Sequence, residues 1–407
     1  MKTNKTCLGC GSEKLDSIIK LGEQPLANSL IKEIEKVHSE RFYNLEVMLC
    51  ADCGLAQLKD IINPSDLFSD YVYFSSYSQT VLDSAKEIAL KTCKELNKES
   101  FVVEIASNDG YLLKNYVEQG FDVLGIDPAQ NIAEFANAKG INTLSNFFTE
   151  ELANKIATEK KRADVIHANN VMAHVPNIND FIKGIKALLH KQGKAIIEVP
   201  YFVDLIQKLE FDTIYHEHVY YFLVKPLKNI FAKHNLELFN VERIPLHGGT
   251  IRLFVGHLGA YKIQPAIDEH IAQENQMGMY EAETYKKFMD KIFNLKETLL
   301  QTLQKIKEDN KKIVAYGASA KGATLLNFFG IGKHHLDFVV DRSLAKQNLY
   351  TPGTHLPIYA PETLLDVKPD YVLLLTWNFA DEIMQQQESY RQLGGKFIIP
   401  IPELQII

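Results

Sequence analysis

Hydrophobic and polar positions in residues 80–258 follow two patterns that take turns along the chain. Short apolar runs predict strands, and apolar residues three or four positions apart predict amphipathic helices. The predicted strands are 101–106, 123–127, 141–144, 163–170 and 194–200, with a later pair at 236–244 and 250–258. The predicted helices are 80–98, 112–120, 132–140 and 181–193, the last closed by Gly193. Such alternation predicts a parallel sheet covered on both faces.

A second alternating unit follows the charged stretch 265–311, which itself predicts a mostly helical bridge. Its predicted strands lie within 311–322, 336–343, 370–377 and 395–402. A chain of 407 residues is also too long for one ordinary core. We therefore predict an α/β protein of three domains, at residues 1–64, 65–257 and 258–407.

Composition narrows the class of protein further. The chain is 46% hydrophobic and 23% charged, as in soluble globular proteins, and its net charge is −7. That charge argues against a protein that coats nucleic acid or an anionic membrane. No apolar run is long enough to span a bilayer, and the N-terminus lacks the apolar region of a secretory signal. We expect a cytoplasmic protein without nucleic-acid or membrane partners, and structural disulfides are not expected there.

Four of the five cysteines form two pairs with the same spacing. Cys7 and Cys10 make one pair, Cys50 and Cys53 the other, and a glycine follows each pair directly. Two such turns can supply four thiolates in the tetrahedron that zinc prefers. Sulfur would fill every position, so the predicted zinc site is structural. Two redox-active pairs are the alternative, and Cys93 is left over in a predicted helix.

The stretch VVEIASNDGYLL (102–113) predicts a strand, a polar turn with Gly110 and the start of a helix. The next strand ends at Asp127, where a carboxylate can accept both hydroxyls of a ribose. A single glycine does not favour a diphosphate, so the loop indicates a nucleoside cofactor without a pyrophosphate. A plain α/β turn is the alternative.

The stretch IYHEHVYYF (214–222) concentrates two histidines, a glutamate and three tyrosines. These residues could perform acid–base chemistry, bind a metal or form a polar corner of the core. Tyr220, Tyr221 and Phe222 are expected in the core. A further polar turn, Gly317–Gly322, follows a strand and could meet a phosphate at a helix N-terminus, with a structural turn as the alternative.

The motif ExxSNDGxLL (104–113), followed by GIDPA (125–129), resembles the cofactor motifs of class I S-adenosylmethionine-dependent methyltransferases. Nearly the full chain resembles the sugar C-methyltransferases of deoxysugar biosynthesis. That resemblance rests on the cysteine module and on YVYFSSYS (71–78), NNVMAHVPN (169–177), IYHEHVYYF, HGGTIR (247–252), YGASAKG (316–322) and DRSLAKQNLYTPGTHLPI (341–358). It implies a class I methyltransferase core between a small zinc-binding domain and a C-terminal α/β domain that helps to bind a nucleotide-sugar.

The resemblance also implies roles for individual residues. Members of the family place a methyl group on C3 of nucleotide-linked 4-keto-deoxysugars. The residues expected to line the S-adenosylmethionine site are Glu104, Ala106, Ser107, Asn108, Gly110, Asp127, Pro128, Asn146, Phe147, Asn169 and Asn170. Those expected to perform the chemistry are His218 as base, Glu217 to orient or tune it, and Tyr215 and His174 as donors to the enolate oxygen. Those expected to contact the substrate are Tyr73, Tyr77, Arg252 and Lys321.

Three other functions remain open on the sequence alone. They are methyl transfer to oxygen or nitrogen of another small molecule, an NAD-linked sugar oxidoreductase that uses the second α/β unit, and a zinc-containing binding protein without chemistry. Copurified S-adenosylhomocysteine would favour a methyltransferase, whereas bound NAD would favour the oxidoreductase. We expect a monomer or a weak dimer.

Overall fold

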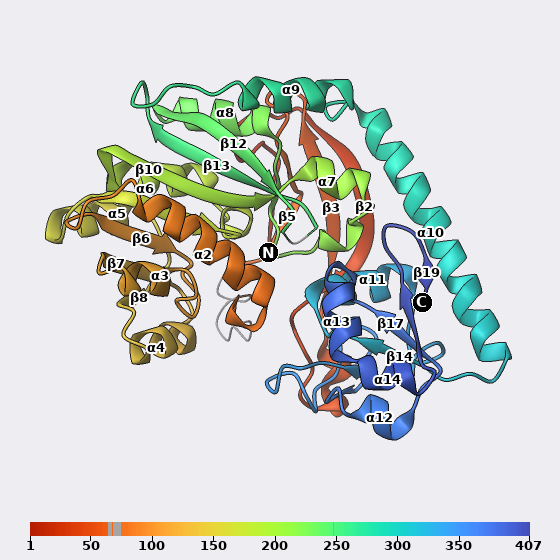
Figure 1. Ribbon diagram of the computed structural model, residues 1–407. Coiled ribbons are helices and arrows are strands. Elements are labelled where there is room, and N and C mark those ends of the chain that lie inside the picture. The colour runs from red at the N-terminus through yellow and green to blue at the C-terminus, as the bar shows by residue number, and fades with distance from the viewer. Residues whose placement is uncertain (64–66, 68–74, 247) are drawn as a thin grey trace.

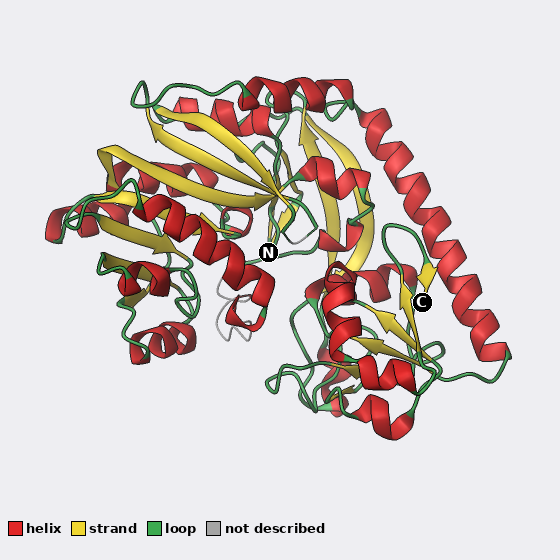
Figure 2. Ribbon diagram, viewed as in Figure 1, coloured by secondary structure: helices red, strands yellow, loops and turns green. Residues whose placement is uncertain are grey.

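The computed structural model describes residues 1–63, 67, 75–246 and 248–407, and its three larger sheets divide the chain into three units (Figures 1 and 2). The predicted parallel sheet forms the largest of them. It has seven strands in the order β12-β13-β10-β9-β6-β7-β8, and only β13 runs against its neighbours. Its strands are β6 (Phe101–Ile105), β7 (Asp122–Asp127), β8 (Thr143–Ser145), β9 (Ala163–Asn169), β10 (Leu189–Pro200), β12 (Leu236–Ile244) and β13 (Thr250–His257).

Helices cover both faces of this sheet, as its nearly continuous apolar strands require. On one face, Val102 packs with residues of α2 (Gln79–Cys93) and α3 (Leu113–Glu118). On the other, Val103 packs with residues of α5 (Glu150–Glu159) and α6 (Ile178–Leu188). Helix α4 (Gln130–Ala138) follows β7. Successive strand residues thus point to opposite faces of the sheet. The carboxyl ends of β6, β7 and β9 lead into loops.

Two of the predicted helices end earlier than expected, and the first is α2, which was expected to reach residue 98 and ends at Cys93. The helix expected to run to Gly193 ends at Leu188, and β10 begins at Leu189. Residues 189–193 form an irregularity in the pairing of β10 with β9, which resumes at Lys194. A side chain on Gly193 would lie 2.8 Å from the carbonyl oxygen of Ala163, so the glycine permits close approach of two strands.

The N-terminal unit is built on a four-stranded antiparallel sheet, in the order β11-β4-β3-β2. Its elements are β1 (Lys2–Thr3), β2 (Leu15–Pro25), η1 (Ile34–Ser39), β3 (Phe42–Cys50), β4 (Ala56–Leu58) and β5 (Asp60–Ile61). The fourth strand, β11 (Tyr220–Tyr221), comes from much later in the chain. The predicted boundary of this unit, at residue 64, lies outside the described residues. The two units therefore share a sheet.

The expected helical bridge consists of α9 (Ala266–Gln276) and α10 (Ala282–Glu308). Figure 1 shows α10 running beside β2 toward the C-terminal unit, and it contacts both. No helix in the described residues combines the length and the apolar character needed to cross a membrane.

The C-terminal unit is a six-stranded sheet in the order β16-β15-β14-β17-β18-β19. The four predicted strands are confirmed as β14 (Ile313–Tyr316), β15 (Val339–Val340), β17 (Tyr371–Leu374) and β18 (Lys396–Ile399). Two short edge strands were not predicted, β16 (Ile358–Tyr359) and β19 (Gln405–Ile406). Its helices are α11 (Ala320–Phe329), α12 (Thr363–Val367), η5 (Trp377–Phe379), α13 (Ala380–Gln386) and α14 (Glu388–Gln392).

Short elements between the units complete the fold. They are η2 (Ser75–Tyr77), η3 (Met172–His174), α7 (Phe202–Gln207), η4 (Phe211–Thr213) and α8 (Val224–Lys233). Helix α11 of the C-terminal unit packs against η4 and also contacts β2. All three units therefore meet around the residues that follow η4.

Candidate active site

The residues between η4 and β11 form a largely buried loop, here called the histidine loop (residues 214–219). The amide of His218 donates to the carbonyl of Tyr215 at 2.9 Å and closes a tight turn. The amide of Val219 then donates to the carbonyl of Ala173 at 2.7 Å, which ties the loop to η3. This places the rings of His174 and His218 edge to face, with 4.8 Å between their centroids. The loop and the end of β9 are thus brought together.

Two hydrogen bonds fix the orientation of the His218 ring. Its Nδ1 lies 2.8 Å from the carbonyl oxygen of Thr213, which can only accept, so Nδ1 carries the proton. Its Nε2 lies 2.9 Å from the hydroxyl of Tyr215, and the two rings are 4.1 Å apart. In the neutral ring, Nε2 is therefore the basic nitrogen, and it accepts from Tyr215.

Glu217 points to a different partner, the side chain of Asn28, which donates to its carboxylate at 2.7 Å. Burial raises the pKa of Glu217 to about 7, and the hydrogen bond from Asn28 opposes part of that rise. Burial also lowers the pKa of His174 to about 4, so its imidazole is neutral at pH 7. The loop thus holds a carboxyl group that titrates near neutrality beside two imidazoles.

The other members of the stretch are structural. His216 faces the N-terminal unit, where its Nε2 donates to the carbonyl of Tyr43 at 3.2 Å and its ring packs edge-on against the Tyr43 ring. Tyr220, Tyr221 and Phe222 are buried in the core, which confirms that prediction.

The turn after β6 is shaped by left-handed backbone positions and by one carboxylate. Ala106, Asn108 and Gly110 have φ angles of 55°, 47° and 78°. A side chain on Gly110 would collide with Ile141, so both the backbone and the space require glycine. Asp127 accepts from the amides of Asn108 and Ala129, each at 3.0 Å. Its carboxylate therefore braces the turn at the carboxyl end of β7.

Several buried polar atoms near this turn call for a ligand. Within the described residues, Ser107 Oγ, Asn169 Oδ1 and the Asp109 carboxylate are buried without hydrogen-bond partners. Buried polar groups are nearly always paired, so a polar molecule that reaches these atoms fits the site. Asn169 and Asn170 also line a small pocket with Tyr111.

The remaining predicted cofactor residues lie around Asp127. The amide of Asn146 donates to the Asp127 carbonyl at 3.2 Å, and Pro128 follows directly. Phe147 is 50% exposed, which leaves an aromatic face available for a planar ring. Burial and the carboxylates of Asp109, Asp127 and Glu198 raise the pKa of the fully buried Glu104 well above its usual value. The donor set fits a nucleoside, with Asp127 as the group that would hold its ribose.

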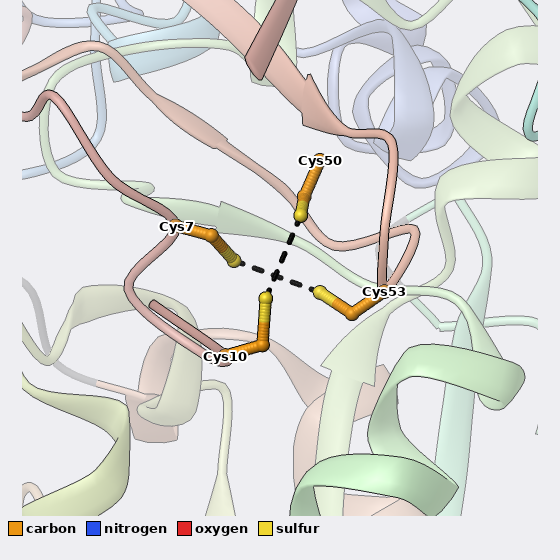
Figure 3. A group of neighbouring side chains, drawn as sticks. All are labelled: Cys7, Cys10, Cys50 and Cys53. Carbon is orange, nitrogen blue, oxygen red and sulfur yellow. Dashed lines mark hydrogen bonds between the residues drawn. The ribbon is translucent and has the colours of Figure 1, made fainter. Parts of the chain in front are cut away.

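The four cysteines converge as the spacing predicts (Figure 3). Their Sγ atoms all lie within 4.8 Å of one another, and Cys7–Cys53 and Cys10–Cys50 are each 3.6 Å apart. The two turns are alike: the amides of Gly11 and Gly54 donate to the carbonyls of Cys7 and Cys50, both at 2.8 Å. Four thiols at this spacing, on two matching turns, fit a tetrahedral zinc ion.

Two of the expected substrate residues lie in or near the segment 71–78. Tyr73 lies outside the described residues, and Tyr77 is 59% exposed at the end of η2. The amide of Ser75 donates to the side chain of Asn108 at 2.9 Å, so Ser75 lies against the cofactor turn. Tyr77 follows Ser75 by two residues in the same short helix.

Arg252 lies elsewhere, on β13. It is 5% exposed and its Nε donates to Glu198 at 2.8 Å, with Glu242 3.6 Å from its guanidinium. Two carboxylates therefore occupy the donors that a phosphate would need, and the structure does not bring Arg252 together with Lys321.

Lys321 belongs to a buried cluster between α11 and η4. Its Nζ lies 3.8 Å from Glu210 and 4.7 Å from the centre of the Trp377 ring. Trp377 in turn donates from Nε1 to Asp212 at 2.6 Å. Burial raises the pKa of Glu210 to about 7, and Lys321 opposes the rise. Ser319 caps the N-terminus of α11, since its side chain accepts a hydrogen bond from the amide of Gly322.

Sequence reasoning missed three residues that contact the histidine loop or η4: Asn28, Trp377 and Thr324. Thr324 donates to the carbonyl of Ile214 at 3.3 Å. Each lies 110 to 189 positions from its partner, so no local spacing could have indicated the contact.

Comparison with known proteins agrees with the three units. Family models match as "Putative zinc binding domain" at residues 7–68, "Methyltransferase domain" at 77–241 and "C-methyltransferase C-terminal domain" at 245–402. The chain is 34% identical to "C-methyltransferase NovU" of Streptomyces niveus over 98% of its own length and 96% of that protein.

Solved structures match only in part. The CcbJ methyltransferase of Streptomyces caelestis is 12% identical, with a TM-score of 0.35 over 43% of this chain and 90% of that chain. A SAM-dependent methyltransferase of Anabaena variabilis is 18% identical, with a TM-score of 0.35 over 43% and 85%. The fold assignment rests instead on the strand order and the family models.

The strand order, with its one reversed strand, and the cofactor turn define the central unit as a class I methyltransferase, whose methyl donor is S-adenosylmethionine. A structural zinc site accompanies it at the N-terminus. Taken over its whole length, the chain belongs to the C-methyltransferase family. An oxidoreductase and a binding protein without chemistry are thereby set aside.

Replacement of Asp127 by alanine should weaken S-adenosylmethionine binding by about 1–3 kcal/mol, the effect of losing a buried hydrogen-bond partner. Calorimetric titration would measure it, with Asp122→Ala as a matched control, since that exposed aspartate begins the same strand. Equal affinities for the two variants would remove Asp127 from the ribose role.

Proposed function

We propose that the methyl acceptor is C3 of a nucleotide-linked 4-keto-deoxysugar and that the reaction passes through an enolate of the sugar. The cluster of Tyr215, Glu217, His218 and His174, in which Glu217 and His218 are buried, carries this proposal. Methylation beside a ketone requires a base for the departing proton and donors for the enolate oxygen. S-adenosylmethionine supplies the electrophilic methyl group when it is bound.

His218 is the proposed base. Its Nδ1 proton is held by the carbonyl of Thr213, so Nε2 takes the C3 proton, either directly or through the Tyr215 hydroxyl that donates to it. His174 is neutral and can donate one N–H to the enolate oxygen. Glu217, with a pKa of about 7, is the second candidate base.

We propose that the C-terminal unit contacts the nucleotide part of the substrate, with Lys321 as its cation, and that Tyr73 and Tyr77 contact the substrate. The proximity of α11 to the histidine loop supports this, through the contact of Thr324 with Ile214. Arg252 is left out because Glu198 and Glu242 already pair with it. The same proposal includes a cytoplasmic location and a monomer or weak dimer.

Incubation of the zinc-loaded protein with S-adenosylmethionine and a panel of 4-keto-deoxysugar nucleotides tests the proposal. Mass spectrometry should find one added methyl group, and NMR should place it on C3. A methyl on C5, the other carbon beside the ketone, would correct the position but keep the enolate. Methylation of oxygen or nitrogen, or no turnover of any ketosugar, would overturn the proposal.

A further inference from the structure

Asn28 lies outside every motif of the sequence, in the segment between β2 and η1, yet its side chain reaches the histidine loop. Its Nδ2 donates to Glu217 Oε1 at 2.7 Å. Glu217 is only 4% exposed, so this contact is made out of reach of bulk water. A residue of the zinc-binding unit thus donates a hydrogen bond to a carboxylate of the candidate active site.

The segment that carries Asn28 is held from the other side by the C-terminal unit. The backbones of Ile31 and Tyr350 exchange two hydrogen bonds, at 3.0 and 2.9 Å. Glu40 accepts from the amide of Gly353 and meets His355 Nε2, both at 2.7 Å. These anchors lie on both sides of η1, so the position of Asn28 is set by two units at once.

We propose that Asn28 is a positioning residue, whose amide orients the Glu217 carboxylate and keeps it ionised beside the reacting sugar. The role in the reaction rests on the function proposed above, because it assumes that Glu217 faces the sugar. An amide N–H can donate to the charged carboxylate but gains nothing comparable from the neutral acid, so it favours the ionised form.

Among the groups around Glu217, Asn28 is the one that lowers the Glu217 pKa against the effect of burial. Burial is the larger influence on the Glu217 pKa and raises it, and the Asn28 hydrogen bond lowers it. The titratable neighbours are His174, which interacts with the Glu217 backbone, and His216 and His218 in the same loop. Loss of the amide should therefore raise the Glu217 pKa further, so that the carboxyl is more protonated at neutral pH.

The test is the titration of Glu217 in Asn28→Ala, followed by NMR of protein with ¹³C-labelled glutamate and assigned with Glu217→Gln. We expect the midpoint to rise by about one pH unit or more. The acid limb of kcat/KM should move upward by the same amount, and the rate should recover toward wild type at higher pH. Simple damage to the fold would lower the rate at every pH instead.

Two further variants sharpen the result. Asn28→Asp keeps the shape of the side chain but places a second carboxyl group against Glu217. It should therefore raise the Glu217 midpoint more than Asn28→Ala does. If Asn28→Ala does not fold, the midpoint in Asn28→Asp tests the role of Asn28. Asn44→Ala is the matched control, because Asn44 donates to Asp60 at 3.0 Å in the same unit. It should leave the Glu217 midpoint where it is in wild type.

The outcomes separate this inference from the proposed function. The NMR titration needs no sugar, so an unmoved midpoint in both Asn28 variants overturns the role of Asn28 even if ketosugars are methylated. A shifted midpoint without methylation of any ketosugar would overturn the proposed substrate and leave the control of Glu217 by Asn28 standing.

Discussion

His218→Ala should lower turnover by about 10²–10⁴-fold, the usual contribution of a positioned base. The affinity for S-adenosylmethionine should barely change, because the base serves the sugar and Asp127 lies at a different strand end. The loss follows from the geometry, since the Thr213 carbonyl holds the Nδ1 proton and leaves Nε2 as the group that can accept another. Steady-state kinetics and calorimetry on the same preparation would measure the two quantities.

Proton exchange identifies the base more directly than turnover does. With a cofactor analogue that cannot donate methyl, wild type should wash deuterium from the solvent into C3, and His218→Ala should not. Tyr215→Phe should abolish exchange if the hydroxyl relays the proton to Nε2, and only slow methylation if Tyr215 stabilises the enolate oxygen. Glu217→Gln should lower the rate less than His218→Ala does.

A neighbouring histidine provides the control. His216→Gln retains a donor for the Tyr43 carbonyl and should keep turnover near that of wild type. Exchange at the wild-type rate in His218→Ala would place the base elsewhere, with Glu217 next because its pKa is about 7.

Local patterns were sufficient for the central sheet and for the zinc site. Strand β6 and its turn follow from an apolar run that ends in polar residues and Gly110, and the cysteine turns follow from their spacing and glycines. In each case a few adjacent residues determine the backbone, so the signal lies within a short window.

The features that the sequence did not predict depend on contacts between distant parts of the chain. Two-residue strands such as β16 and β19 are too short to show a period, and β11 is a strand only because β4 lies beside it. The partners of Glu217 and Asp212 are distant in sequence, so Asn28 and Trp377 carry no signal of their own. The pairing of Arg252 with Glu198 across neighbouring strands is likewise not visible in the motif that contains Arg252.

These distant contacts have a common consequence. Asn28 from the zinc-binding unit holds Glu217, Thr324 from the C-terminal unit holds the carbonyl of Ile214, and η3 of the methyltransferase unit holds Val219. Ile214 and Val219 anchor the two ends of the loop in the hydrophobic core, and hydrogen bonds from all three units position the polar residues between them.

Loss of zinc should therefore affect catalysis at a distance from the metal. Cys50→Ser should lower the metal content from about one zinc per chain to well below it, because a structural site with one thiolate removed is incomplete. Binding of zinc to such sites is worth about 10–16 kcal/mol in small domains, so the N-terminal unit should loosen. Helices and strands around the cofactor turn should persist, because α2 and α3 cover one face of that sheet in a core cluster that holds no residue of the N-terminal unit.

Cys50→Ser should consequently change proteolysis and turnover but not the affinity for S-adenosylmethionine. Limited proteolysis should cut within residues 1–63, and turnover should fall sharply because Asn28 and the pairing of β11 with β4 depend on that unit. The affinity for S-adenosylmethionine should stay near that of wild type. Cys93→Ser is the matched control, since Cys93 lies at the end of α2, outside the cluster, and should keep its zinc and its activity. Metal-free protein that remains fully folded and active would contradict the structural role of the site.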